Sequence, residues 1–194
     1  MARTAQAFPV LLDYWAAQNS ARRHVWPGLF TSQIPAPTAT PAARAEAAAQ
    51  GWSARELLDQ VQAQRARNGD GLVSGHIHFS MVALMQDRDG IATQLRAGPY
   101  AEPALPPASR WLNGSMPPPP TPGVRVAGAR ATITPAPGPA PAQWAVWRQI
   151  AGRWRFDAYP GAQRQVDLGG ADALAVSAAD RCGQLSESNR VTLK

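Results

Sequence analysis

The N-terminal half of the chain alternates between apolar spacing typical of helices and short apolar segments typical of strands. Apolar residues at helical spacing over residues 8–15 predict a first helix that ends near Asn19. A second helix is predicted to begin at Ser53, which has Glu56 three positions later, as in a capping box. A third is predicted over residues 87–98. The segments 24–30 and 74–84 are predicted strands, and a loop rich in proline and alanine joins the first strand to Trp52.

The C-terminal part has a different pattern, in which short β-type segments are bounded by Gly, Pro, Asp or Asn. Ala151-Gly152 lies between two such segments and predicts the tip of a hairpin. Several short antiparallel strands within some seventy residues favour a small β-sandwich. The predicted strands are 124–133, 144–150, 154–159, 165–168, 173–178 and 190–193.

All three histidines lie in the two strands predicted in the N-terminal half. Strand alternation predicts that His24 and Trp26 share one face of the first strand, and that His76, His78 and Ser80 share one face of the second. We therefore expect one polar face with imidazoles, an indole and a hydroxyl, and an opposite apolar face packed under helices. An α/β barrel builds its site in this way, at the carboxyl ends of its strands.

Composition indicates a folded protein with flexible connections: 45% of the 194 residues are hydrophobic, and the 19 prolines are clustered. The net charge of +6 comes from dispersed arginines and the single lysine, Lys194. Without a basic patch, aromatic platforms or a groove-reading helix, we expect no nucleic-acid partner. No stretch is long and apolar enough for a membrane span, and the first residues lack the features of a signal peptide. Cys182 is the only cysteine, which excludes an intrachain disulfide and favours a small buried residue over a nucleophile.

Two segments, HVWPGLFTSQI and GHIHFSMVAL, with a helix between them and GPYAEPALPPASRWL after them, resemble the C-terminal portion of the glycosyl-hydrolase-like 10 family. This is a bacterial family of TIM-barrel proteins assigned as glycoside hydrolases. The later segments AQWAVWRQIAGRWRFDAYP and ADALAVSAADRCGQLSE resemble the fibronectin type III-like module that follows the barrel in many members.

The resemblance implies an α/β plus all-β fold: the last βα units of a (β/α)8 TIM barrel, followed by a small β-sandwich. The expected organisation is a barrel part over 1–113, a proline-rich linker over 114–123 and a fibronectin type III-like sandwich over 124–194. A whole barrel needs about 250 residues, so roughly six strands are missing and the chain is expected to be a fragment. Expressed alone, this fragment is expected to aggregate or to be only partly ordered upstream of Trp111, because its sheet edges and apolar face are uncovered.

The function implied by the resemblance is hydrolysis of a bacterial polysaccharide, with peptidoglycan glycan strands as one candidate. Glycosidases use two carboxylates, and no Asp or Glu falls inside either predicted strand that carries histidine. Asp87 and Asp89 lie at a predicted helix start, where they are expected to cap the helix. The catalytic residues are therefore unknown, and this segment alone is expected to be inactive.

We expect this segment to contact substrate through Trp26, His78 and Ser80. Trp26 could stack on a pyranose ring or close the end of the barrel core. His76 is expected to be a satisfied interior histidine. Two histidines one residue apart could also bind zinc, with His24 as a third ligand, but no nearby carboxylate completes that set, so we expect no metal and no cofactor.

An alternative function class is a non-catalytic module, in which the sandwich binds carbohydrate or protein and the barrel part is vestigial. Trp144 and Trp147, three positions apart in a predicted strand, should face opposite sides, so one indole could be exposed for glycan while the other packs in the core. Trp154 has the same two interpretations. Oligomeric state and localisation are not indicated by the sequence, although an exported full-length form would lie in the periplasm or cell envelope.

Overall fold

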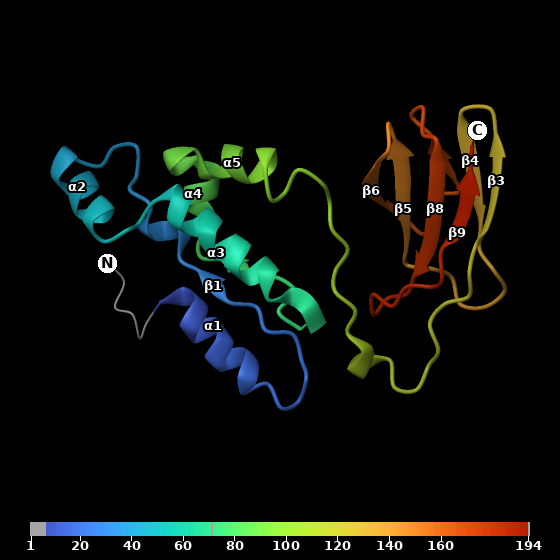
Figure 1. The fold of residues 1–194 in the computed structure, drawn as a ribbon, viewed down its shortest axis with the longest axis horizontal. Helices are drawn as coiled ribbons and strands as arrows, with labels where there is room; N and C mark the ends of the chain where they lie inside the picture. Colours follow the sequence, from blue (N-terminus) through green and yellow to red (C-terminus); the bar gives the residue numbers. More distant parts are fainter. Residues whose placement is uncertain (1–6, 71, 194) are drawn as a thin grey trace. The chain divides into compact units, whose positions relative to one another are not determined.

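The computed structural model describes residues 7–70 and 72–193 of the chain. These residues divide into two compact units, one ending at Ala101 and one beginning at Glu102 (Figure 1). Each unit has its own buried apolar cluster and is described separately.

The N-terminal unit combines helices with a two-stranded parallel sheet. Its α-helices are α1 (Phe8–Ala17), α2 (Pro41–Ala49), α3 (Ala54–Ala66), α4 (Met81–Met85) and α5 (Ile91–Ala97). Its strands are β1 (Gly28–Leu29) and β2 (Ile77–His78). Short 3-10 turns span Thr31–Gln33, Asn68–Asp70 and Arg88–Gly90.

The core of this unit lies where α3 and α5 cover one face of the sheet. Leu29 of β1 and Ile34 are buried against Leu57 and Val61 of α3 and Ile91 of α5. Complete burial of a Leu or Ile side chain contributes about 1.5–3 kcal/mol relative to exposure. Leu57 and Val61 are therefore the residues that attach α3 to the sheet.

The predicted helix boundaries are largely confirmed, whereas the two strands are much shorter than predicted. The first helix ends at Ala17, and Ser53 caps α3 by accepting a hydrogen bond from the Glu56 amide at 3.2 Å. The predicted strand over 74–84 is wrong beyond residue 78, because the residues from Met81 form α4. The predicted loop before Trp52 contains α2, which has Thr40 as its N-cap and an alanine-rich interior that favours a helix.

The predicted polar and apolar faces are also wrong, because the strand register pairs the two strands differently. Gly28 lies beside Ile77, and Leu29 lies beside His78. Adjacent residues of parallel strands point to the same face. His78 therefore shares the helix-covered face with buried Leu29, while Ile77 is 55% exposed on the opposite face.

The C-terminal unit is a β-sandwich of two antiparallel sheets, as the alternating pattern predicts. One sheet has the order β3-β4-β7 and the other β6-β5-β8-β9. The strands are β3 (Gly123–Ala127), β4 (Arg130–Thr134), β5 (Gln143–Ile150), β6 (Arg153–Pro160), β7 (Gln165–Asp167), β8 (Ala173–Ala179) and β9 (Asn189–Thr192), with a 3-10 turn at Arg110–Leu112. The predicted single strand over 124–133 is instead the hairpin of β3 and β4.

Large side chains from both sheets fill the sandwich. Trp144 and Val146 of β5 pack with Leu174 and Val176 of β8 and with Ile133 of β4. The predicted hairpin tip is confirmed: Ala151 and Gly152 join β5 to β6 with φ of 48° and 76°. Two successive positive φ values are typical of the tight turns that connect antiparallel strands.

Candidate functional site

His78 lies in a chain of hydrogen bonds that joins four side chains of the N-terminal unit. Its Nε2 lies 2.8 Å from the Tyr100 hydroxyl, which also contacts Nε2 of His76. Nδ1 of His76 lies 3.1 Å from Oε1 of Gln64, on α3. We call Gln64, His76, His78 and Tyr100 the imidazole relay.

The proton positions in the imidazole relay follow from the orientation of the Gln64 side-chain amide. The amide nitrogen of Gln64 donates to the Val73 carbonyl, so Oε1 of Gln64 must accept from Nδ1–H of His76. A neutral His76 then has a bare Nε2, which accepts from the Tyr100 hydroxyl. Tyr100 in turn accepts from Nε2–H of His78, and Nδ1 of His78 is left as a buried acceptor without a hydrogen-bond partner among the described residues.

Burial keeps both imidazoles of the relay neutral. It lowers the pKa of His76 to about 4, and the neighbouring charges of His78 and Arg65 act in the same direction. Burial also lowers the pKa of His78 and raises that of Tyr100. The relay is therefore suited to orienting a polar group by hydrogen bonding and unsuited to holding an anion by charge.

Trp26 lies at the start of the sheet, apart from the imidazole relay. Its ring stacks on His24, with centroids 5.5 Å apart and planes inclined by 11°. Its Nε1 donates to the Ser74 hydroxyl at 3.1 Å, and that hydroxyl lies 3.1 Å from Nδ1 of His24. The indole is held in place while 47% of its surface is exposed.

Ser80 belongs to a cluster of hydroxyl groups just beyond the carboxyl ends of the two strands. The Ser80 amide donates to Oγ of Ser32 at 2.9 Å, and the two hydroxyl oxygens lie 3.1 Å apart. Oγ1 of Thr31 donates to the Ser80 carbonyl at 3.0 Å. The peptide bond between Phe79 and Ser80 is cis.

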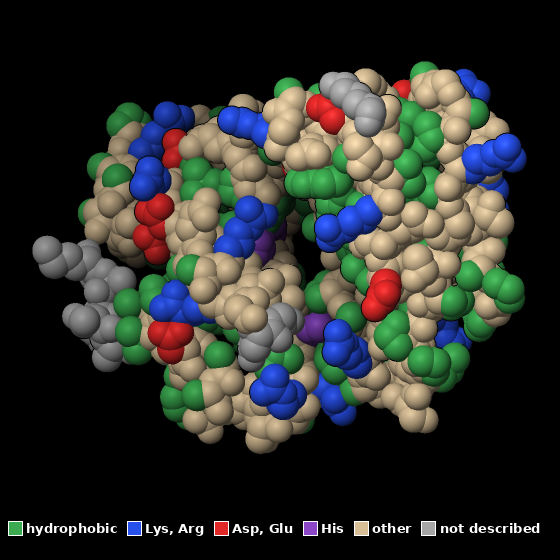
Figure 2. Space-filling model, turned by 45° about the vertical axis from the view of Figure 1, so that its right-hand side comes forward, with side chains coloured by type: hydrophobic (Ala, Val, Ile, Leu, Met, Phe, Trp, Pro, Cys, Tyr) green, Lys and Arg blue, Asp and Glu red, His purple; other side chains and the backbone are tan. Residues whose placement is uncertain are grey.

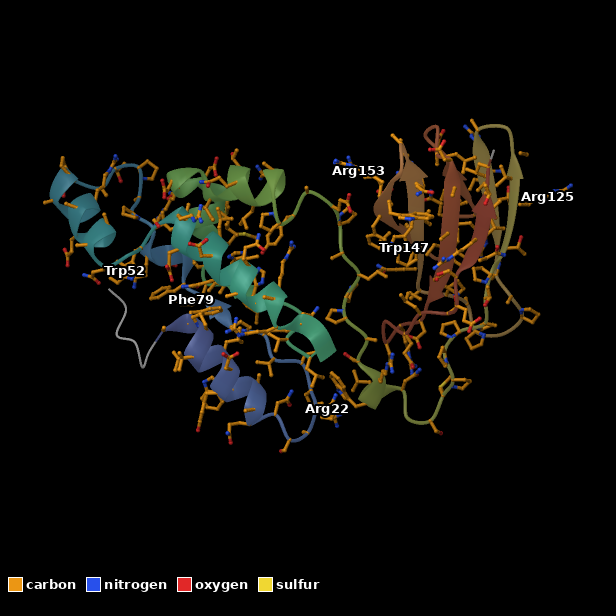
Figure 3. The ribbon with its side chains drawn as sticks, in the orientation of Figure 1. Arg22, Trp52, Phe79, Arg125, Trp147 and Arg153 are labelled. Carbon is orange, nitrogen blue, oxygen red and sulfur yellow. The ribbon has the colours of Figure 1, made fainter. Side chains whose placement is uncertain are left out.

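Two phenylalanines beside these hydroxyls are exposed, and neither was predicted as a site residue. Phe30 and Phe79 have ring centroids 5.2 Å apart and exposed fractions of 49% and 61%. Strand alternation does not indicate which face of the sheet each ring occupies. Only the strand register shows that both rings lie on the uncovered face. Together with Ser32 and Ser80 they form what we call the strand-end site, and Figure 3 shows Phe79 within this unit.

The structure thus separates the three residues predicted to contact substrate. Ser80 lies in the strand-end site, His78 in the imidazole relay on the helix-covered face, and Trp26 at the opposite ends of the strands. Gln64 and Tyr100, which complete the relay, come from segments distant in sequence and carry no local signal. Gln64 is one of several polar residues in α3. Its burial can be recognised only once α3 is packed on the sheet.

The two acidic residues beyond the predicted second strand both cap helices, but only Asp87 caps the helix expected, because Asp89 bonds to the start of α3. Asp87 accepts hydrogen bonds from the amide and hydroxyl of Thr93, at 3.0 Å and 2.6 Å. These bonds lower the pKa of Asp87. Asp89 accepts from the Ala54 amide, at the first turn of α3. Within the described ranges no group of three or more His, Cys, Asp or Glu residues is arranged to hold a metal ion.

In the β-sandwich, Trp144 and Trp147 face opposite sides of β5, as predicted. Trp144 is fully buried, whereas Trp147 packs on Phe156 with ring centroids 5.2 Å apart. Trp154, on the neighbouring strand, is 45% exposed. The face outside the sandwich core therefore has an aromatic row, Trp147, Trp154 and Phe156, across β5 and β6.

On the surface in view in Figure 2, arginine side chains form separate spots rather than one patch. Across residues 7–70 and 72–193, the helices are all too short or too polar to span a bilayer.

No family model matches the chain and no curated protein matches it, so neither comparison supports the glycosyl-hydrolase-like resemblance. Among solved structures, an FN3 domain of human collagen XX is similar, with 19% sequence identity and a TM-score of 0.30. That match covers 46% of this chain and 100% of the collagen domain. The assignment of the C-terminal unit as a β-sandwich rests on the strand order of this chain itself.

Proposed function

We propose that the N-terminal unit is the closing part of a larger (β/α)8 barrel of the glycoside-hydrolase type, and that it contacts a bacterial polysaccharide. Peptidoglycan glycan strands are the leading candidate. In this proposal the fibronectin type III-like sandwich is an accessory module, and this segment supplies substrate contacts rather than the catalytic carboxylates.

The parallel pairing of β1 and β2 supports a larger sheet. Parallel strands joined through helices normally occur in sheets covered on both faces. Here each strand pairs only with the other within the described residues, and Phe30, Ile77 and Phe79 are exposed on one face. Further βα units would pair with the free edges and cover part of this face.

The strand-end site carries the proposal of a sugar ligand. Sugars present a C–H face that packs on aromatic rings and hydroxyl groups that exchange hydrogen bonds with serines. Phe30 and Phe79 offer rings, and Ser32 and Ser80 offer hydroxyls, at the carboxyl ends of the strands. In barrels that end carries the ligand site.

Hydrolysis itself would need carboxylates from elsewhere. Asp87 and Asp89 are engaged in hydrogen bonds to backbone amides, and neither lies in a strand. An acid and a base or nucleophile on opposite sides of the glycosidic bond are the usual requirement. We therefore expect binding, without turnover, from this chain alone.

The test measures the affinity of the full chain for chitohexaose by NMR shift titration, and compares the wild type with Phe79→Ala. We expect a roughly tenfold weaker affinity, because loss of one stacking ring removes about 1.4 kcal/mol. Tyr14→Ala removes an equally aromatic side chain, 56% exposed on α1, and should leave affinity unchanged. Equal affinity for the wild type and Phe79→Ala would contradict the proposal.

The aromatic row of the sandwich favours a second candidate, the non-catalytic carbohydrate-binding module. Trp154 is exposed beside Trp147 and Phe156, as expected for a surface that stacks on sugar. Trp154→Ala in the same titration separates the two candidates. Weaker binding with Trp154→Ala, together with unchanged binding with Phe79→Ala, would favour the module.

A further inference from the structure

Trp52 is held in a fixed position between two helices. At the end of α2 the Gly51 amide donates to the Ala48 carbonyl at 3.0 Å, and the Trp52 amide donates to the Ala47 carbonyl at 2.9 Å. These two bonds form a Schellman motif, in which Gly51 has the required positive φ of 77°. The Gly51 and Trp52 amides thus both bond to the last turn of α2.

The backbone on the other side of Trp52 is fixed by the start of α3. The Ser53 side chain accepts from the Glu56 amide at 3.2 Å, and Asp89 accepts from the Ala54 amide at 2.8 Å. Asp89 belongs to the loop that follows β2 and α4, so this bond also ties the α2–α3 junction to that loop. Because the backbone on both sides of Trp52 is fixed, little backbone freedom is lost when a ligand binds to the indole, which favours affinity.

Open space adjoins this indole in two cavities. One, of about 420 Å³, is lined by Trp52 together with Pro35, Pro37, Arg44 and Arg88. The other, of about 110 Å³, is lined by Trp52 together with Phe30, Gln33 and Gln60. Phe30 also contacts Phe79, so the smaller cavity lies between the strand-end site and Trp52. Figure 3 labels Phe79 and Trp52 in this unit.

Two guanidinium groups and two carboxylates line the larger cavity. Arg44 donates from Nη2 to the Pro37 carbonyl, and Arg88 donates from Nη1 to the Ile34 carbonyl at 3.0 Å. Each guanidinium has five N–H donors, so donors remain for a ligand. The carboxylates of Asp87 and Asp89 at this cavity already accept backbone hydrogen bonds.

We propose that Trp52 is the stacking platform of a second sugar subsite, which takes a further pyranose unit of the glycan bound at the strand-end site. The inference rests on the proposed function and extends it to a ligand longer than one or two sugars. Pyranose C–H groups pack on the indole, and guanidinium donors of Arg44 and Arg88 bind ring hydroxyls. The subsite selects chain length, because only a longer glycan reaches both the strand-end site and Trp52.

The experiment compares chitohexaose with chitobiose by NMR shift titration of the full chain and of its Trp52→Ala variant. We expect Trp52→Ala to weaken chitohexaose binding about tenfold and to leave chitobiose binding unchanged. Trp15→Ala removes an indole that is 61% exposed on α1 and should change neither affinity. Trp52→Phe retains a ring and should recover most of the chitohexaose affinity, which guards against loss of folding as the cause.

The outcomes separate this inference from the proposed function. Unchanged chitohexaose binding by Trp52→Ala, with weaker binding by Phe79→Ala, would overturn the Trp52 subsite and leave the proposed function standing. An equal loss of chitohexaose and chitobiose binding in Trp52→Ala would also overturn the subsite, because chain-length selection would be absent. Binding of neither sugar by the wild type would overturn both.

Discussion

At the scale of single residues, hydrogen-bond partners determine which nitrogen of each relay histidine carries the proton. The Val73 carbonyl orients the Gln64 amide, and that amide determines which nitrogen of His76 carries the proton. The Tyr100 hydroxyl then donates to His76 and accepts from His78. Buried polar groups are costly unless they are bonded, so the relay holds the sheet and α3 in one arrangement as well as orienting Nδ1 of His78.

We predict that this proton order is visible in the nitrogen chemical shifts of the imidazoles. At pH 7.5 both rings should be neutral, His76 protonated on Nδ1 and His78 on Nε2, and His76 should titrate only near pH 4. Long-range ¹H–¹⁵N spectra of the full chain between pH 4 and 8 provide the measurement. An imidazolium signal from His76 at pH 6 would disprove the order deduced here.

The same lowered pKa has a stability consequence, whose sign follows from proton linkage. The unfolded histidine takes up a proton near pH 6.5 and the folded His76 only near pH 4, so the unfolded state binds more protons between these values. The stabilisation is complete above pH 6.5 and declines as the pH falls towards 4. For a half-buried ring screened by solvent, the loss is about 1–2 kcal/mol, measurable as faster hydrogen exchange in residues 74–100.

At the scale of elements, capping decides where helices begin and end. Thr40 and Ser53 each accept a backbone amide hydrogen bond three positions later, and Gly51 closes α2. In β5 and β6 the same local control comes from the turn at Ala151-Gly152, which sets the pairing of Gln149 with Trp154. Local signals of this kind place elements along the chain without specifying what each face will touch.

Substitution Gly51→Ala should therefore destabilise the α2–α3 junction through the backbone alone. A Cβ at this position would meet no atom within 4 Å, but the φ of 77° is unfavourable for alanine by about 1 kcal/mol. Urea unfolding of the full chain measures the change. Gly69→Ala is the matched control, since its Cβ would also meet nothing and its φ lies outside the positive region, and a loss of equal size there would refute the argument.

At the scale of the whole molecule, each unit has its own core, so we expect each to have its own free energy of unfolding. The sandwich encloses Trp144, Val146 and Val176 between two sheets, whereas the N-terminal unit leaves Ile77, Phe79 and Met85 exposed. An uncovered apolar face of this kind promotes association with itself or with another surface. The N-terminal unit is accordingly expected to be the less stable and more aggregation-prone part of the isolated chain.

The variant Trp144→Ala should lower the stability of the sandwich by about 3–5 kcal/mol, because it empties a fully buried site. The protection of amides in α3 and α5 against hydrogen exchange should stay as in the wild type. Trp154→Ala, at a tryptophan that is 45% exposed, is the control and should cost less than about 1 kcal/mol. Equal loss of protection in both units would show that they unfold as one.

Sequence alone determined the features that depend on neighbours along the chain. The Ser53 cap, the turn at Ala151-Gly152 and the opposite facing of Trp144 and Trp147 all follow from spacing within a few residues. They are predictable because backbone geometry links positions at fixed periods of 3.6 or 2 residues.

Only the tertiary structure decided which of these features meet. A strand of two residues has too little alternation to fix its face, and the pairing of Leu29 with His78 turned the imidazoles towards the helices. The same register brought Phe30 and Phe79 together on the uncovered face, and docking of α3 brought Gln64 to His76. Each of these contacts joins residues more than ten positions apart, where packing and register, and no local period, determine what lies beside what.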